Sequence, residues 1–289
     1  MPTLRNETLV VDISAQGAEL QRIYNKQTNL DYLWNADSKY WAKHSPVLFP
    51  IVGELKNGSY TYEGATYKLG RHGFAREMQF IISDHTETSV TFTITETPDT
   101  VIMYPFQFKF SIQYTIDSSR LYVIYSVENT GNEIMYFSLG GHPAFKVPLT
   151  DNTDFEDYYL SFSQIENAER YPLSTEGLIQ TTSINFFNNA EKMPLKRNLF
   201  YEDALVFKHF QSKSITVKND NVANGFTFYF EGFPYLGIWT KKDADFLCIE
   251  PWCGVADNTD TTGDLTQKEG INLLQTGEIF ERQWSVELF

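Results

Sequence analysis

Three short segments of the sequence place a titratable side chain beside glycine or proline. They are Arg71-His72-Gly73-Phe74, Gly140-Gly141-His142-Pro143 and Cys248-Ile249-Glu250-Pro251-Trp252. Each follows an apolar stretch, and rigid scaffolds often carry functional side chains on the loops and strand ends that follow such stretches. Imidazole and carboxylate groups can both be tuned to titrate near neutral pH. If the fold brings the three segments together, they suit general acid–base chemistry.

Each of these residues also has a purely structural interpretation. His142 could be a polar residue in a turn at a strand end, and His72 could belong to a solvated basic turn with Arg71 and Arg76. Glu250 could be an exposed carboxylate before a proline. If it is instead partly buried, its pKa is expected to rise and make it a better base. Spacing along the chain does not decide between these interpretations.

Several other kinds of site are excluded by missing motifs. No GxGxxG or GxxxxGK[ST] loop follows a strand pattern, which excludes a dinucleotide or P-loop site. No GxSxG motif supports an acyl-transfer serine. The two cysteines, Cys248 and Cys253, are too few for a disulfide scaffold and form no zinc-type pattern.

Composition limits the class of partner. The 289 residues carry a formal net charge of −14, which argues against nucleic acid or an anionic membrane as the main partner. Aromatic residues make up 16% of the chain, which suits broad β-sheets and also a cleft that binds sugar rings. The N-terminus has no signal-peptide pattern and no apolar run is long enough to cross a bilayer, so we expect a cytoplasmic protein.

The elements that must position these side chains are predicted to be strands. Apolar residues alternate strictly over 106–116, and a turn at 117–120 returns the alternation over 121–127. Such patterning is typical of antiparallel sheets with one buried face. Further strands are predicted around 135–139, 215–217, 226–230, 237–240, 246–250 and 279–286, with a hairpin that turns at Glu63-Gly64.

Two stretches look different. Two prolines bracket the apolar run 45–53, which predicts a rigid buried loop, and residues 146–200 predict loops and short strands. No long amphipathic helix, linker or repeat is visible. The sequence therefore predicts an all-β protein, a large antiparallel β-sandwich, with residues 1–289 in a single domain.

Four motifs in order resemble the aldose 1-epimerase (galactose mutarotase-like) family. They are Ser-Pro-Val-Leu-Phe-Pro (45–50), His-Gly-Phe-Ala-Arg (72–76), Gly-Gly-His-Pro-Ala-Phe (140–145) and Ile-Glu-Pro-Trp (249–252). The resemblance covers essentially the whole chain. It implies a β-sandwich enzyme that interconverts α and β anomers of aldohexoses without a cofactor or a metal.

The resemblance also implies roles for individual residues. His142 would be the general acid that protonates the ring oxygen, and Glu250 the base that takes the proton from the C1 hydroxyl. His72 would hydrogen-bond the sugar, and Arg71 would contact a hydroxyl. Asp203, at the start of an apolar run, is the best match to an aspartate that binds sugar hydroxyls. Gly140 and Gly141 are expected to leave room for substrate.

One motif departs from the galactose-specific enzymes, whose first histidine motif looks more like His-Gly-Gly. The form found here is similar to relatives that act on hexose 6-phosphates, in which arginines bind the phosphate; Arg71 and Arg76 would do so here. The alternative is that both arginines pair with surface carboxylates. The expected small-molecule partner is thus a sugar or a sugar phosphate. The competing functional hypothesis is a non-catalytic carbohydrate-binding protein on the same fold.

Overall fold

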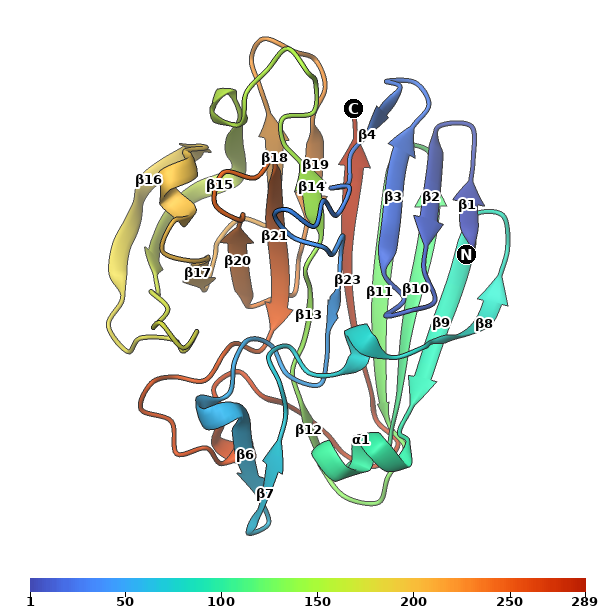
Figure 1. Ribbon diagram of the computed structural model, residues 1–289, viewed down its shortest axis with the longest axis vertical. Helices are drawn as coiled ribbons and strands as arrows, with labels where there is room; N and C mark the ends of the chain where they lie inside the picture. Colours follow the sequence, from blue (N-terminus) through green and yellow to red (C-terminus); the bar gives the residue numbers. More distant parts are fainter.

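The structure, a computed structural model, describes residues 1–289 and consists almost entirely of strands (Figure 1). The strands are β1 (Thr3–Arg5), β2 (Leu9–Ile13), β3 (Leu20–Asn25), β4 (Leu30–Asp31), β5 (Val47–Leu48), β6 (Ser59–Tyr62), β7 (Ala65–Lys68), β8 (Ile81–His85), β9 (Ser89–Thr95), β10 (Phe108–Asp117), β11 (Arg120–Asn129), β12 (Met135–Phe137), β13 (Leu139–Gly141), β14 (Ala144–Lys146), β15 (Tyr159–Arg170), β16 (Ile184–Pro194), β17 (Leu205–Lys208), β18 (Ser214–Lys218), β19 (Phe226–Tyr229), β20 (Tyr235–Trp239), β21 (Phe246–Cys253), β22 (Asn272–Leu274) and β23 (Ile279–Leu288). The helices are α1 (Pro98–Met103) and the 3-10 turns η1 (Lys56–Gly58), η2 (Ala75–Glu77), η3 (Phe155–Asp157), η4 (Arg197–Phe200) and η5 (Leu265–Gln267). No helix has the length and apolarity needed to span a bilayer.

One large antiparallel sheet of 15 strands organises the molecule. Its strand order is β5-β13-β21-β20-β17-β15-β18-β19-β23-β11-β10-β9-β8, with β14 also paired to β21 and β16 to β15. A smaller four-stranded sheet, β1–β4, lies beside the β8–β11 and β23 part of it (Figure 1). The hydroxyl of Tyr114 on β10 donates to the carbonyl of Ala18 between β2 and β3, which ties the two sheets together. The predicted antiparallel β-sandwich is confirmed.

The alternating runs form the sheet as predicted. β10 and β11 pair over their whole length, from Phe108 opposite Asn129 to Asp117 opposite Arg120. Every second side chain of both strands is buried, because successive residues of a strand point to opposite faces. One hydrophobic cluster of 65 buried residues extends from Leu4 to Leu288.

The proline-bracketed segment is buried, as expected, but contains the short strand β5, which pairs with β13. Phe49 anchors it: its ring stacks on Phe110 with centroids 4.6 Å apart. Pairing occurs because β5 lies at one end of the sheet order, where one side of the strand needs no partner.

The prediction of only loops and short strands over 146–200 is wrong. β15 and β16 are 12 and 11 residues long and form a hairpin whose pairing is interrupted by register shifts. These irregularities break the period-2 pattern, since each bulge moves later side chains to the other face. Many exposed positions of this outer hairpin also carry polar residues, which made its strands harder to recognise from the sequence.

Candidate active site

The strand that delivers His142 is interrupted at that residue. β13 and β14 pair with the same strand, β21, in one continuous register on both sides of the interruption. Ala144 lies opposite Cys248, so the same register places His142 opposite Glu250. Residues directly opposite on antiparallel strands have Cβ atoms about 5 Å apart. The sheet itself therefore brings these two side chains together.

Their side chains meet in a buried contact. Nε2 of His142 lies 3.2 Å from Oε2 of Glu250, and the two residues are only 8% and 2% exposed. Burial raises the pKa of Glu250 well above its usual value, and the charge of Asp203 adds to this shift. Burial also lowers the pKa of His142. Both shifts favour the uncharged forms, so the pair holds one proton between its two groups.

The sequence suggested that Glu250 lies at a strand end, but the structure places it elsewhere. It lies inside β21, which continues through Pro251 to Cys253. A proline cannot donate to a ladder, and central strands normally exclude it for that reason. Here the pairing of β21 with β13 ends at Gly140 and Trp252 and resumes with β14 at Ala144 and Cys248, so Pro251 lies where the ladder on that side is interrupted.

His72 is held by the buried segment that precedes it. The backbone N–H of Gly53 donates to Nδ1 of His72 over 3.0 Å, which leaves the ring proton on Nε2. The backbone of His72 has a φ of 66°, a left-handed conformation that is uncommon for a residue other than glycine. Its neighbour must be glycine, because a Cβ at Gly73 would lie 2.2 Å from the carbonyl oxygen of Phe49. The tight turn aims an Nε2–H donor at the cavity described below.

The two arginines lie next to each other on the same turn. Nη2 of Arg76 donates to the carbonyl of Arg71 over 2.9 Å, and Nε of Arg71 lies 3.2 Å from a carboxylate oxygen of Glu54. Burial lowers the pKa of Arg76. Each arginine lines the cavity, as contact with a substrate requires. Each also has a carboxylate nearby, as the alternative of pairing with carboxylates requires.

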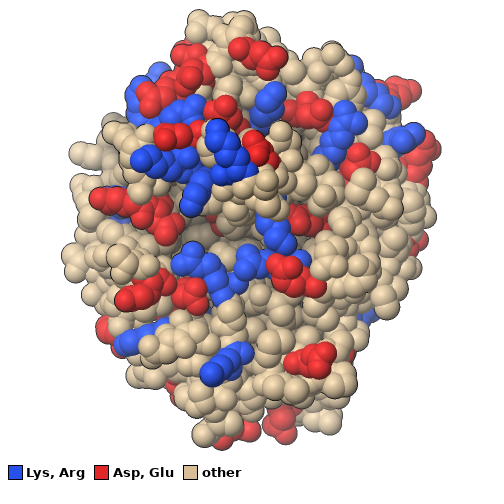
Figure 2. Space-filling model, in the orientation of Figure 1, with Lys and Arg blue, Asp and Glu red and all other residues tan.

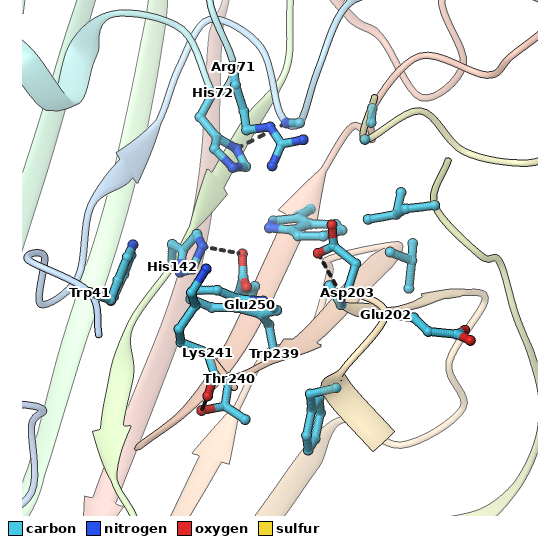
Figure 3. A pocket seen from close by; sticks show the side chains of 18 of the residues that line it. Trp41, Arg71, His72, His142, Glu202, Asp203, Trp239, Thr240, Lys241 and Glu250 are labelled. Carbon is cyan, nitrogen blue, oxygen red and sulfur yellow. Dashed lines mark hydrogen bonds and ion pairs between the residues drawn. The ribbon is translucent and has the colours of Figure 1, made fainter. Parts of the chain in front are cut away.

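Asp203 lies between η4 and β17, in a strained conformation with a φ of 154°. Its Oδ1 accepts the N–H of Ala204 over 2.7 Å, and its carboxylate reaches into the space beside Glu250 (Figure 3). Backbone strain of this kind persists only where the surroundings impose it, and it clusters at functional sites.

All six residues singled out in the sequence line one cavity of about 450 Å³. They are His142, Glu250, His72, Arg71, Arg76 and Asp203. Figure 2 shows a hollow on this face with lysine and arginine side chains around it. The basic residues that line it are Arg71, Arg76, Lys241 and Lys242. They face the carboxyl groups of Glu202, Asp203 and Glu250 across the same cavity, in a chain whose net charge is −14.

Among the other lining residues, three that surround His142 were missed in the sequence: Trp41, Trp239 and Lys241. Trp41 lies in a polar loop before β5, and Trp239 ends β20. Lys241 follows that strand and extends its amino group toward the same space as His142 (Figure 3). The available signal for Trp41 was the aromatic pair Tyr40-Trp41 within a mostly polar loop, and nothing in the sequence marked Trp239 or Lys241.

The expected role of the two glycines before His142 is wrong. A Cβ at Gly140 would lie 2.6 Å from the Trp252 ring, and one at Gly141 would lie 2.8 Å from the Tyr125 hydroxyl. These glycines make room for aromatic side chains of the protein and not for a substrate.

One group of side chains has the composition of a metal site. The ligand atoms of His142, Cys248 and Glu250 lie within 4.8 Å of one another, and all three residues are buried. A thiol must lose its proton to bind a metal. Burial raises the pKa of Cys248 well above its usual value. The protonated thiol packs with Trp34, Ala144 and Phe246 beside the His142–Glu250 pair.

Comparison with known proteins identifies the fold and the relatives of this chain. The family model described as aldose 1-epimerase matches residues 2–272. The chromosomal protein LacX of Lactococcus lactis subsp. lactis is 32% identical over 279 residues, which cover 93% of this chain and 92% of that protein.

Solved structures agree with that result. A galactose mutarotase related enzyme from Lactobacillus acidophilus is 34% identical with a TM-score of 0.95, over 100% of this chain and 97% of the other. A galactose mutarotase-like protein from Lactobacillus casei is 29% identical with a TM-score of 0.94, over 100% of both chains.

Proposed function

Since the chain belongs to the aldose 1-epimerase family, we propose that it is a mutarotase that interconverts the α and β anomers of an aldohexose or a hexose 6-phosphate. The observation that carries the proposal is the buried contact between Nε2 of His142 and Oε2 of Glu250 in a cavity of about 450 Å³. A binding protein has no need of such a pair, because holding a sugar requires no proton transfer.

The chemistry sets the geometry of the pair. Ring opening removes a proton from the C1 hydroxyl and adds one to the ring oxygen, and both oxygens are bonded to C1. The acid and the base must therefore be neighbours, as His142 and Glu250 are. In the form of the pair that has the shared proton on His142 and Glu250 ionised, Glu250 takes the hydroxyl proton while His142 protonates the ring oxygen. Rotation about C1–C2 exposes the other face of the carbonyl, and the two groups exchange roles as the ring closes.

The other lining residues bind and orient the sugar in this proposal. The Nε2–H of His72 donates to a sugar oxygen, and Asp203 accepts from sugar hydroxyls. Arg71 and Arg76 contact hydroxyls or a phosphate. The basic surround of the cavity supports the phosphorylated substrate, because it offers charge-assisted hydrogen bonds to a dianion. The cytoplasmic location stays a prediction from the sequence.

The test is exchange NMR at equilibrium with glucose, galactose and their 6-phosphates. We expect the protein to speed exchange between the anomeric signals of at least one of them. A preference for the phosphate appears as a larger kcat/KM. Binding without faster exchange would instead support the carbohydrate-binding protein.

A further inference from the structure

The imidazole of His142 is surrounded by other rings. Trp41 stacks on it with centroids 4.9 Å apart and planes inclined by 27°. Trp239 and His72 meet it edge-on, each with centroids 5.7 Å apart (Figure 3). The one flat contact is therefore with Trp41.

Hydrogen bonds do not fix the orientation of this ring. A catalytic or metal-binding histidine is usually fixed by a hydrogen bond from its second nitrogen to a carboxylate or a carbonyl. Nε2 of His142 faces Glu250, but Nδ1 is buried without a hydrogen-bond partner. Aromatic contacts must therefore set the plane of the imidazole.

Trp41 is itself firmly placed, although it lies in a loop. Its ring stacks on Phe246 of β21 with centroids 5.6 Å apart and meets the edge of Trp239 at 5.5 Å. Its carbonyl oxygen accepts the indole N–H of Trp34 over 2.9 Å. The indole is thus a fixed surface against which the imidazole can rest.

We propose that Trp41 is a positioning residue for His142, holding the plane of the imidazole and stabilising its protonated form through the face of the indole. Aromatic faces attract cations, most strongly where water is excluded. The inference deepens the proposed function, on which it rests. The other titratable or charged groups around the imidazole are Glu250, Cys248, Asp203, His72, Arg71, Arg76 and Lys241. None of them stacks flat on the imidazole, since the ring of His72 is inclined to it by 82°.

The test compares Trp41→Leu with Trp41→Phe, which keeps an aromatic face. In Trp41→Leu we expect kcat to fall about tenfold and the His142 titration, followed by ¹⁵N NMR of the imidazole, to move down by about one pH unit. Trp41→Phe should lie between this variant and the wild type in both measurements.

The matched control is Tyr40→Leu. Tyr40 is the adjacent residue, lines the same cavity and contacts Trp34 but not His142. Its loss should leave the His142 titration in place. An unchanged titration in folded Trp41→Leu, or an equal shift in Tyr40→Leu, would overturn the inference. The His142 titration can be measured without turnover. A wild type that does not speed anomer exchange would therefore contradict the proposed function without deciding the role of Trp41.

Discussion

Nε2 of His142 lies 3.2 Å from Oε2 of Glu250, and the register of β13, β14 and β21 sets the two residues opposite each other. The pair is made by sheet geometry and not by a flexible loop. Its place in the 15-stranded sheet means that the acid and the base stay together whether or not a sugar is bound.

The pH dependence of activity should be bell-shaped, because the pair works while it holds one proton. Burial lowers the pKa of His142 and raises that of Glu250. Activity therefore falls at acidic pH when the His142–Glu250 pair takes up a second proton. It falls at basic pH when the pair loses the proton that the two groups share. The two apparent values belong to the coupled pair. Exchange NMR across the pH range measures the profile; one that rises or falls monotonically would contradict the shared proton.

Glu250→Gln should lose roughly 10²–10⁴-fold in activity yet gain stability at neutral and basic pH. In the unfolded wild type Glu250 ionises above about pH 4.3, whereas burial raises its pKa in the native state. The native state then binds more protons than the unfolded state, so stability falls as the pH rises. Glutamine has no titratable group, so Glu250→Gln does not lose this stability as the pH rises.

Thermal unfolding from pH 4 to 8 checks this prediction. The Tm advantage of Glu250→Gln over the wild type should grow with pH. A difference that stays constant over that range would show that the carboxyl is not held in its neutral form.

Gly177→Ala should weaken substrate binding by displacing Arg71. A Cβ at Gly177, which has a φ of +79°, would lie 1.8 Å from Nη2 of Arg71. We expect a roughly tenfold rise in KM, the size of one lost hydrogen bond to a charged group. Gly64→Ala is the matched control, since Gly64 has a φ of +77° and nothing within 4 Å of the added Cβ. Equal KM values for the two variants would remove Arg71 from the binding site.

Lys268→Met should strongly destabilise the fold. Nζ of Lys268 lies 2.6 Å from Oδ1 of Asp257, and both side chains are 3% exposed. The other carboxylate oxygen of Asp257 accepts the N–H of Lys56. Removing one partner leaves a buried charge unpaired, which costs about 3–5 kcal/mol.

Urea denaturation measures that loss. Lys196→Met removes the exposed ion pair with Glu156 and should change the free energy of unfolding by less than about 1 kcal/mol. Similar losses in the two variants would argue that the Lys268–Asp257 pair contributes no more than a surface contact.

Much of the fold and the composition of the site could be predicted from local pattern. Alternation gave β10, β11 and β23, and the Glu63-Gly64 turn gave the hairpin of β6 and β7. The three polar motifs pointed to His72, His142 and Glu250, because a titratable residue next to glycine or proline can be recognised from the sequence alone.

Long-range geometry could not be predicted. The opposition of His142 and Glu250 depends on register between distant strands, which no local residue encodes. Trp41 carries no motif and reaches the site only because its loop packs on Phe246. The hairpin of β15 and β16 was not predicted because its bulges break the period-2 pattern.

The most direct test of the central claim is anomer exchange by saturation-transfer NMR with glucose, galactose and their 6-phosphates, for the wild type, His142→Asn and Glu250→Gln. Catalysed exchange of at least one sugar by the wild type, with a loss of roughly 10²–10⁴-fold in each folded variant, is the predicted result. Exchange at the buffer rate for all four sugars, or wild-type turnover by either variant, would contradict the account.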